Sequence, residues 1–234
     1  MAARTQPAHL PASTPVVECG EPLVDLRRVG GIAFGPPPEC PETEPYYTLV
    51  RRTVYEKLLR VQDRLPNGWC LRLYEGLRSL QVQQAMFDQE QQRVRARQPD
   101  LSPEDTHASA CRLVSPVTHW DGNPNVPFHA TGGAVDVELL DANGVLVEMG
   151  MAIRDWATVL PDWCLPRCPG LPKVVQGHRD LLAVSMAQEG FMPYAHEWWH
   201  FSYGDTYWAC YSGRQAAIYG PCTSEMVAQA SGGS

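Results

Sequence analysis

The sequence predicts a single α+β domain with a central antiparallel sheet flanked by helices. Residues 69–74 and 134–139 show the period-2 alternation of strands, whereas residues 46–65 and 79–97 show the apolar spacing of helices. The 234 residues, 44% of them hydrophobic, can bury one sizeable core, and no linker interrupts the middle of the chain. We expect an extended arm over residues 1–21, one domain over 22–223 and a flexible tail over 224–234.

Charge and hydropathy narrow the class of protein. The net charge of −7 and the pI near 5.5 give no support for nucleic-acid binding. No segment approaches the roughly 18 apolar residues of a membrane span, and the N-terminus lacks the apolar region of a secretory signal. We therefore expect a cytoplasmic protein with reduced thiols, although Cys164 and Cys168 could form a disulfide or hold a second metal.

The first half of the chain predicts a short strand at 22–26, a helix over 46–65 and a strand over 69–74. Ser79 is a suitable N-cap for the next helix, which should run to about Arg97, and a short helix should follow over 103–112. Arg78 then lies at a strand-to-helix junction, where functional side chains are often presented. An arginine at such a place is more often a structural ion-pair partner.

The second half centres on the segment 128–139, FHATGGAVDVEL. Its alternation predicts a half-buried strand with Asp136 on the polar face. The two glycines allow the preceding loop to turn back, so that His129 can approach Asp136. We expect a hairpin turn at 141–144, a strand over 145–149 and a helix over 178–190.

The stretch His196-Glu197-Trp198-Trp199-His200 fits the H-E-x-x-H signature of helical zinc proteases. Pro193, Gly204 and the aromatic run between them favour a strand instead. On a strand, residues four apart are separated by about 13 Å, too far to share one zinc ion. We therefore predict that His200 alone is a ligand, with Glu197 close to the metal but not bound to it.

Together, His129, Asp136 and His200 predict a zinc site with one zinc ion per chain. Three protein ligands leave a coordination position open for water, as a catalytic site requires. Glu197 is a candidate general base, and Arg78 could stabilise the oxyanion that forms during hydrolysis.

These residues lie in motifs that resemble the VanX-type D-alanyl-D-alanine dipeptidases. This family is related in fold to the D-Ala-D-Ala carboxypeptidases and the hedgehog domain. The resemblance spans roughly residues 22–204 and implies a cell-wall (peptidoglycan) metallopeptidase of this zinc fold. It implies His129, Asp136 and His200 as zinc ligands, Glu197 as the base and Arg78 as the group that stabilises the transition state. The motifs are HATGGAVD at 129–136, EWWH at 197–200, SYGD at 202–205 and YEGLR at 74–78.

The chain departs from the family pattern in three places. Arg28 stands where a tyrosine near the substrate is usual, and Pro127 stands where a serine is common. After Met149-Gly150, the acid that helps to hold the substrate's amine is missing or shifted to Asp155. With Asp155 as the candidate substrate-binding acid, we expect a weaker hold on the amine and less discrimination between free dipeptides and longer peptides.

The function predicted is zinc-dependent hydrolysis of D-alanyl-D-alanine or a similar small dipeptide by a metal-activated water. The alternatives are a zinc peptidase that acts on longer cell-wall peptides and a non-catalytic, zinc-stabilised binding module. The presence of Glu197 and Arg78 beside the ligands disfavours the module, because binding alone needs neither. The predicted partner is a small peptide, with neither nucleic acid nor membrane, and a homo-oligomer remains open.

Overall fold

A computed structural model describes residues 14–232, and its centre is a five-stranded mixed sheet. The strand order is β2-β4-β5-β7-β6, in which β2 and β4 are parallel and the other pairs antiparallel. A separate antiparallel pair is formed by β1 and β3. The strands are β1 (Leu23–Asp25), β2 (Ala33–Phe34), β3 (Leu49–Arg51), β4 (Cys70–Glu75), β5 (Ala134–Leu140), β6 (Met192–Pro193) and β7 (His200–Ser202).

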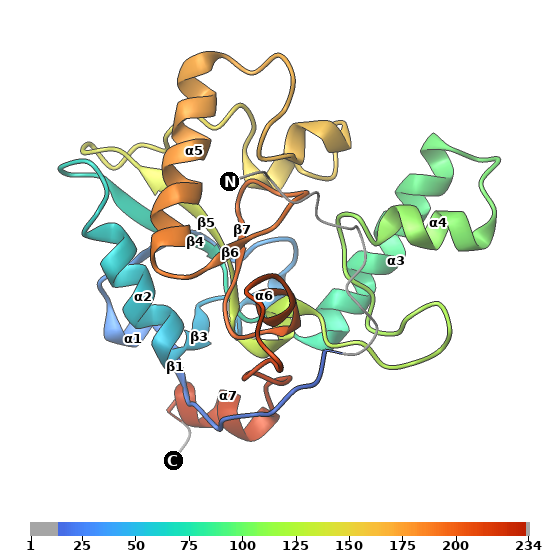
Figure 1. Ribbon diagram of the computed structural model, residues 1–234, viewed down its shortest axis with the longest axis horizontal. Coiled ribbons are helices and arrows are strands. Elements are labelled where there is room, and N and C mark those ends of the chain that lie inside the picture. The colour runs from blue at the N-terminus through green and yellow to red at the C-terminus, as the bar shows by residue number, and fades with distance from the viewer. Residues whose placement is uncertain (1–13, 233–234) are drawn as a thin grey trace.

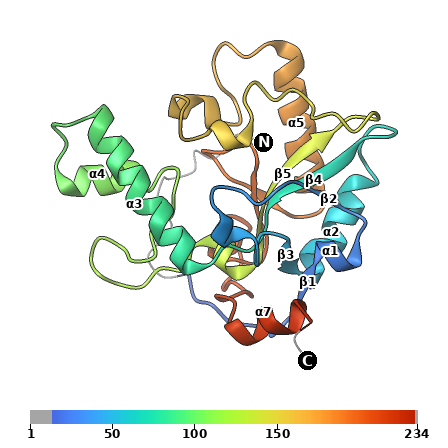
Figure 2. The ribbon, with the colours of Figure 1, turned by 180° about the vertical axis from the view of Figure 1, so that it is seen from behind.

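Helices surround this sheet, which confirms the predicted α+β class (Figures 1 and 2). In both views α3 and α4 project from one side of the molecule, whereas α2 and α5 pack on the other side. Among the described residues, no helix is long and apolar enough to cross a membrane. The α-helices are α1 (Leu26–Val29), α2 (Arg52–Gln62), α3 (Leu80–Arg97), α4 (Pro103–Ala110), α5 (Lys173–Gln188), α6 (Thr206–Tyr211) and α7 (Ser224–Ala230), and four 3₁₀ helices are η1 (Pro41–Thr43), η2 (Phe128–Thr131), η3 (Ile153–Asp155) and η4 (Pro161–Cys164).

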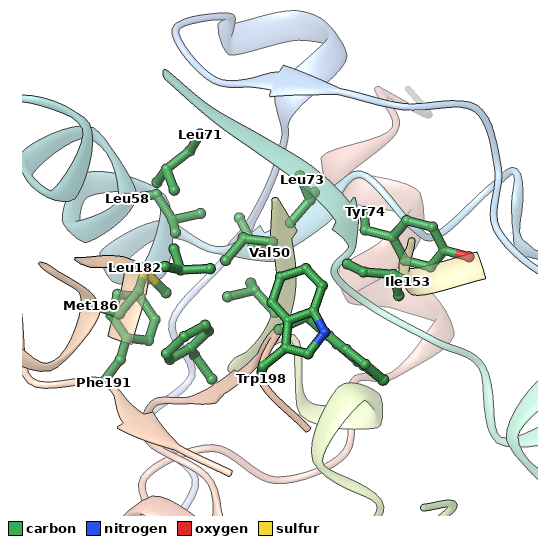
Figure 3. Packing of buried hydrophobic residues seen from close by; sticks show 14 of the residues in the cluster. Val50, Leu58, Leu71, Leu73, Tyr74, Ile153, Leu182, Met186, Phe191 and Trp198 are labelled. Atoms are coloured by element: carbon green, nitrogen blue, oxygen red, sulfur yellow. The ribbon is translucent and has the colours of Figure 1, made fainter. Parts of the chain in front are cut away.

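The main core lies between the sheet and the helices α2 and α5 (Figure 3). Leu58 of α2 and Leu182 and Met186 of α5 meet Leu71 and Leu73 of β4 there. Each buried aliphatic side chain contributes roughly 1.5–3 kcal/mol, so this contact fixes the sheet against the helices. All eight cysteines lie within the described residues and none is bridged.

Several predicted elements differ in extent. The predicted helix over 46–65 begins only at Arg52, because residues 49–51 pair with β1 as the strand β3. The predicted strand over 145–149 is wrong: only an isolated bridge joins Leu146 to Leu140. β4 lies along one edge of β5 and β7 along the first part of the other, which leaves only residues 139–141 to bond residues 145–147. β5 is buried on both faces rather than half-buried, because Val135, Val137 and Leu139 lie in the main core and the opposite face, with Asp136 and Glu138, is also covered.

The ends of the chain also differ from expectation. The flexible tail predicted over 224–234 is wrong for residues 224–230, which form α7. The hydroxyl of Thr223 accepts a hydrogen bond from the backbone N–H of Met226 and caps this helix, and Met226 packs near Leu23 and Leu49. Within the predicted arm, residues 14–21 run beside 217–220, with Val16 bridged to Ala217. The rest of the arm and residues 233–234 lie outside the described residues.

Candidate metal centre and active site

The register of the sheet places two predicted ligands side by side. Asp136 in β5 lies directly opposite His200 in β7, so the two side chains share one face of the sheet. The Nδ1 atom of His200 lies 3.0 Å from Oδ1 of Asp136. Both residues are buried. Glu197 lies outside any helix and before β7, as the sequence predicted, but the predicted strand begins only at His200, and Trp198 and Trp199 form a turn.

The third predicted ligand, His129, comes from the 3₁₀ turn before β5. Gly132 ends this turn with φ 68°, a left-handed conformation suited to glycine. A side chain at Gly133 would lie 2.3 Å from the carbonyl oxygen of Tyr203, so only glycine allows the chain to approach so closely. The turn brings Nε2 of His129 to 3.1 Å from Nδ1 of His200 and 3.3 Å from Oδ2 of Asp136.

These three donor atoms fit a metal ion. In a tetrahedral zinc site with bonds of about 2.0–2.1 Å, ligand atoms lie about 3.3 Å apart. The two histidine nitrogens lie 3.1 Å apart, and each lies 3.0 to 3.3 Å from one oxygen of the Asp136 carboxylate, Oδ1 for His200 and Oδ2 for His129, which is close to that value. His129, Asp136 and His200 also form the one cluster of possible metal ligands found among residues 14–232.

The protonation of the histidines supports the same conclusion. Nδ1 of His129 lies 2.7 Å from the carbonyl oxygen of Gly76, which only accepts, so this nitrogen carries the proton and Nε2 presents a lone pair. Three acceptor atoms at about 3 Å repel one another unless a cation lies between them. Burial lowers the pKa of His200, which also favours its neutral, metal-binding form.

A second layer orients His200, and sequence reasoning missed it. Nε2 of His200 lies 3.4 Å from the hydroxyl of Ser202, which donates its proton to the buried carboxylate of Asp205. Ser202 Oγ therefore accepts from the Nε2–H of His200, and Nδ1 is left as the acceptor that faces Asp136. Such contacts fix the tautomer of a metal-binding histidine. The signal was in the SYGD motif, whose polar residues sequence reasoning left without a role.

Glu197 lies where a general base is required. It is buried, and its Oε2 lies 3.9 Å from Nδ1 of His200, beside the cluster but outside its inner contacts. Burial raises the pKa of Glu197 well above its ordinary value, and the negative charge of Asp136 raises it further. A cation bound by the cluster would relieve this crowding of carboxylates. His196 is not part of the cluster, and its ring contacts Tyr194 instead.

Arg78 is held rigidly at the end of β4. Its Nε donates to Oε1 of Glu75 at 3.0 Å, its Nη2 pairs with the other oxygen of Glu75, and its Nη1 donates to Gln83 at 3.0 Å. Burial acts to lower the pKa of Arg78, but the carboxylates of Glu75, Asp136 and Glu39 together outweigh it and raise that pKa. Among the described residues, three of the five N–H groups have acceptors, which leaves two for a ligand.

A small pocket joins these groups. It is lined by His129, Asp136, His200, Glu197 and Arg78 together with apolar and aromatic side chains. Its cavity volume is about 50 Å³, which is room for a few water molecules and for a small side chain. The structure therefore brings together the predicted ligands, the predicted base and the predicted arginine.

The predicted substrate-binding acid, Asp155, is not part of this pocket. It ends the 3₁₀ helix η3 with an exposed side chain, while its neighbours Ile153 and Trp156 turn inward and line the pocket. The prediction for Asp155 is therefore wrong on geometric grounds. Glu39, which sequence reasoning passed over within a proline-rich segment, lines the pocket instead.

A buried metal-ligand cluster with an adjacent carboxylate and arginine is characteristic of metal-dependent hydrolases. The profile of the peptidase M15 family, described as D-ala-D-ala dipeptidase, matches residues 48–216. A D-alanyl-D-alanine dipeptidase from Synechocystis sp. is 30% identical over 215 residues, which cover 83% of this chain and 87% of that protein. The chain belongs to the peptidase M15 family of D-Ala-D-Ala dipeptidases and is a hydrolase.

Two solved structures are similar at lower identity. The carboxypeptidase LdcB has a TM-score of 0.43 and 15% identity, over 85% of this chain and 76% of that one. A mutant of the vancomycin-resistance D,D-pentapeptidase VanY, in complex with Zn(II), has a TM-score of 0.40 and 15% identity, over 71% of this chain and 80% of that one.

Proposed function

We propose that this protein hydrolyses D-alanyl-D-alanine, or a similarly small free dipeptide, with one zinc ion bound by His129, Asp136 and His200. The observation that carries the proposal is the convergence of Nε2 of His129, Nδ1 of His200 and the carboxylate of Asp136, at contacts of 3.0–3.3 Å, inside a pocket that also holds Glu197 and Arg78. We place this activity in the cytoplasm, because eight unbridged cysteines suit a reducing compartment.

The residues around the cluster have distinct chemical tasks. Zinc at this site would lower the pKa of a bound water toward 7 and polarise the peptide carbonyl. Glu197, held beside the ligands, would take the proton of the attacking water and return it to the leaving amine. Arg78 would direct its two remaining N–H groups at the oxygen on which negative charge develops.

The pocket dimensions favour a small substrate. The walls of the pocket include the large side chains Met86, Phe128, Trp156, Tyr194 and Trp199, which leave a cavity of about 50 Å³. A methyl side chain fits such a space, whereas a bulky side chain would require these rings to move. This is the feature by which the site favours an alanine dipeptide.

The direct test is hydrolysis of D-Ala-D-Ala by metal-free protein before and after addition of one equivalent of zinc. We expect activity to appear with zinc, to saturate near one ion per chain and to disappear with a chelator. A protein that binds zinc at this site but cleaves only longer peptides would contradict the proposed substrate. A protein that cleaves D-Ala-D-Ala equally well without a metal would contradict the proposed chemistry.

A further inference from the structure

The pocket contains one carboxylate that metal binding and proton transfer leave unused. Three acidic side chains line it: Asp136, Glu197 and Glu39. Asp136 belongs to the ligand cluster, and Glu197 lies beside that cluster as the base. A free dipeptide brings a positively charged α-ammonium group into the same pocket, and an ammonium group out of water needs an acceptor of opposite charge. Glu39 is the acidic side chain available for it.

The backbone at Glu39 is held in an unusual conformation. Its φ of 60° is the one positive value found for a non-glycine residue among the described residues. The N–H of Cys40 donates to the carbonyl oxygen of Pro38 at 2.7 Å, which closes a three-residue turn around Glu39. The buried hydroxyl of Thr43 lies 2.8 Å from that same oxygen and anchors the turn. Backbone conformations of this kind are strained, and they cluster at ligand-binding sites.

The side chain of Glu39 is aimed inward by Trp156. The indole Nε1–H of Trp156 donates to Oε1 of Glu39 at 2.9 Å. Trp156 is itself fixed, because it is buried and the guanidinium of Arg93 lies 4.8 Å from its ring centre. Glu39 is exposed as a whole residue, so it lies at the mouth of the pocket with its carboxylate directed inside.

The carboxylate of Glu39 makes no direct ion pair with a described residue, although Arg78 and Arg93 lie near enough to lower its pKa. Within residues 14–232, no lysine, arginine or histidine nitrogen forms an ion pair with it. Burial raises the pKa of Glu39 by more than the hydrogen bond from Trp156 and the charges of Arg78 and Arg93 lower it, so this carboxylate has given up hydration without gaining such a direct ion pair. An incoming ammonium group supplies that direct ion pair.

We propose that Glu39 binds the free α-ammonium group of the dipeptide and so makes the enzyme selective against N-blocked and longer peptides. This inference rests on the proposed function. The sequence predicts less discrimination between free dipeptides and longer peptides, because the usual acid after Met149-Gly150 is missing. The proposal reverses that expectation, because the turn at Glu39 supplies the acidic group instead of the segment around Asp155. The predicted loss of discrimination then does not occur.

Binding to a catalytically disabled enzyme separates this role from the chemistry. In the zinc-loaded Glu197→Gln background, we would measure the affinity for D-Ala-D-Ala and for its N-acetylated form by calorimetry. Glu39→Gln should weaken binding of the free dipeptide about tenfold to a hundredfold, which is the contribution of a charge-assisted hydrogen bond. It should leave the N-acetylated form unchanged. Glu39→Asp keeps the charge and should lose less, and Asp155→Asn is the matched control, which should bind both peptides as the background does.

The outcomes distinguish this inference from the proposed function. Unchanged affinity for the free dipeptide in Glu39→Gln, or a loss found in Asp155→Asn instead, would overturn the assignment of Glu39 even if the enzyme with Glu197 intact hydrolyses D-Ala-D-Ala. Affinity that depends on Glu39 in an enzyme that hydrolyses no dipeptide would support the ammonium site and refute the proposed hydrolysis. A circular dichroism spectrum equal to that of the background confirms that each variant is folded.

Discussion

Arg78 is tied to Glu75, and this pairing determines how its role must be tested. Both side chains are buried, and Glu75 has no exposed surface. Arg78→Ala therefore removes the counter-charge of a fully buried carboxylate, which typically costs about 3–5 kcal/mol of stability. A loss of activity in this variant alone would confound the chemistry with the fold.

The double variant Glu75→Gln/Arg78→Ala separates the two effects. It removes both charges, so the free energy of unfolding should recover most of what Arg78→Ala loses. Turnover should not recover, because the donors aimed at the developing oxyanion are still absent. Loss of such a donor lowers kcat by about 10²–10³-fold, or roughly 2.7–4 kcal/mol. Urea unfolding of the zinc-loaded variants and steady-state hydrolysis of D-Ala-D-Ala measure the two quantities separately.

Arg78→Lys adds a second comparison. The ammonium group keeps the charge beside Glu75 but lacks the forked donors of the guanidinium, so most of the stability should remain while kcat recovers only in part. The effect should fall on kcat more than on KM, because the charge that Arg78 meets exists mainly in the transition state. A double variant with kcat within about threefold of wild type would show that Arg78 is only the structural partner of Glu75.

The remaining predictions concern the metal and its surroundings. Asp136→Ala and His200→Ala should each lose zinc, whereas His196→Ala should keep it. Metal analysis after dialysis decides between this site and a helical H-E-x-x-H site, in which His196→Ala would lose zinc and Asp136→Ala would keep it. Glu197→Gln should keep zinc and fold but lose about 10²–10⁴-fold in kcat, and a variant with more than a tenth of the wild-type rate would remove Glu197 from the role of base. Ser202→Ala should weaken zinc binding about tenfold to a hundredfold in a competition titration with a chelator, because it removes the contact that fixes the tautomer of His200. Unchanged zinc affinity would refute this role of Ser202.

Elements with strong local signals were predictable from the sequence. The helix α3 begins after Ser79, whose hydroxyl accepts from the N–H of Val82, and it ends at Arg97 as expected. The strands β4 and β5 alternate clearly enough to be found. The strand β3 was missed because Val50 fits both a helical spacing and a strand, and only its pairing with Val24 of β1 decides between them. Tertiary pairing of this kind leaves no mark in a single sequence.

The metal ligands could be predicted from the sequence, whereas the acid proposed to bind the substrate's ammonium group could not. His129, Asp136 and His200 lie in strongly patterned segments, and histidine is rare in this chain, so each position carries its own signal. Glu39 follows three prolines in a segment without periodicity, and only the turn at Cys40 and the contact with Trp156 direct it into the pocket. Asp155 looked suitable by its position after Met149-Gly150, but the 3₁₀ turn there points Trp156 inward instead.

One irregularity in the sheet explains how the arginine reaches the metal ligands. Along β4 and β5, Leu73 pairs with Val137, and the next pair is Glu75 with Asp136. Tyr74 is therefore the extra residue of a β-bulge, without which Tyr74 rather than Glu75 would face Asp136. Because paired residues share a face, the bulge aligns Glu75, Asp136 and His200 across three neighbouring strands. Glu75 then fixes Arg78 so that its Nη2 lies 3.9 Å from Oδ2 of Asp136. A regular β4 would turn Glu75 to the opposite face and take the arginine with it, so the bulge is as necessary to the site as the ligands.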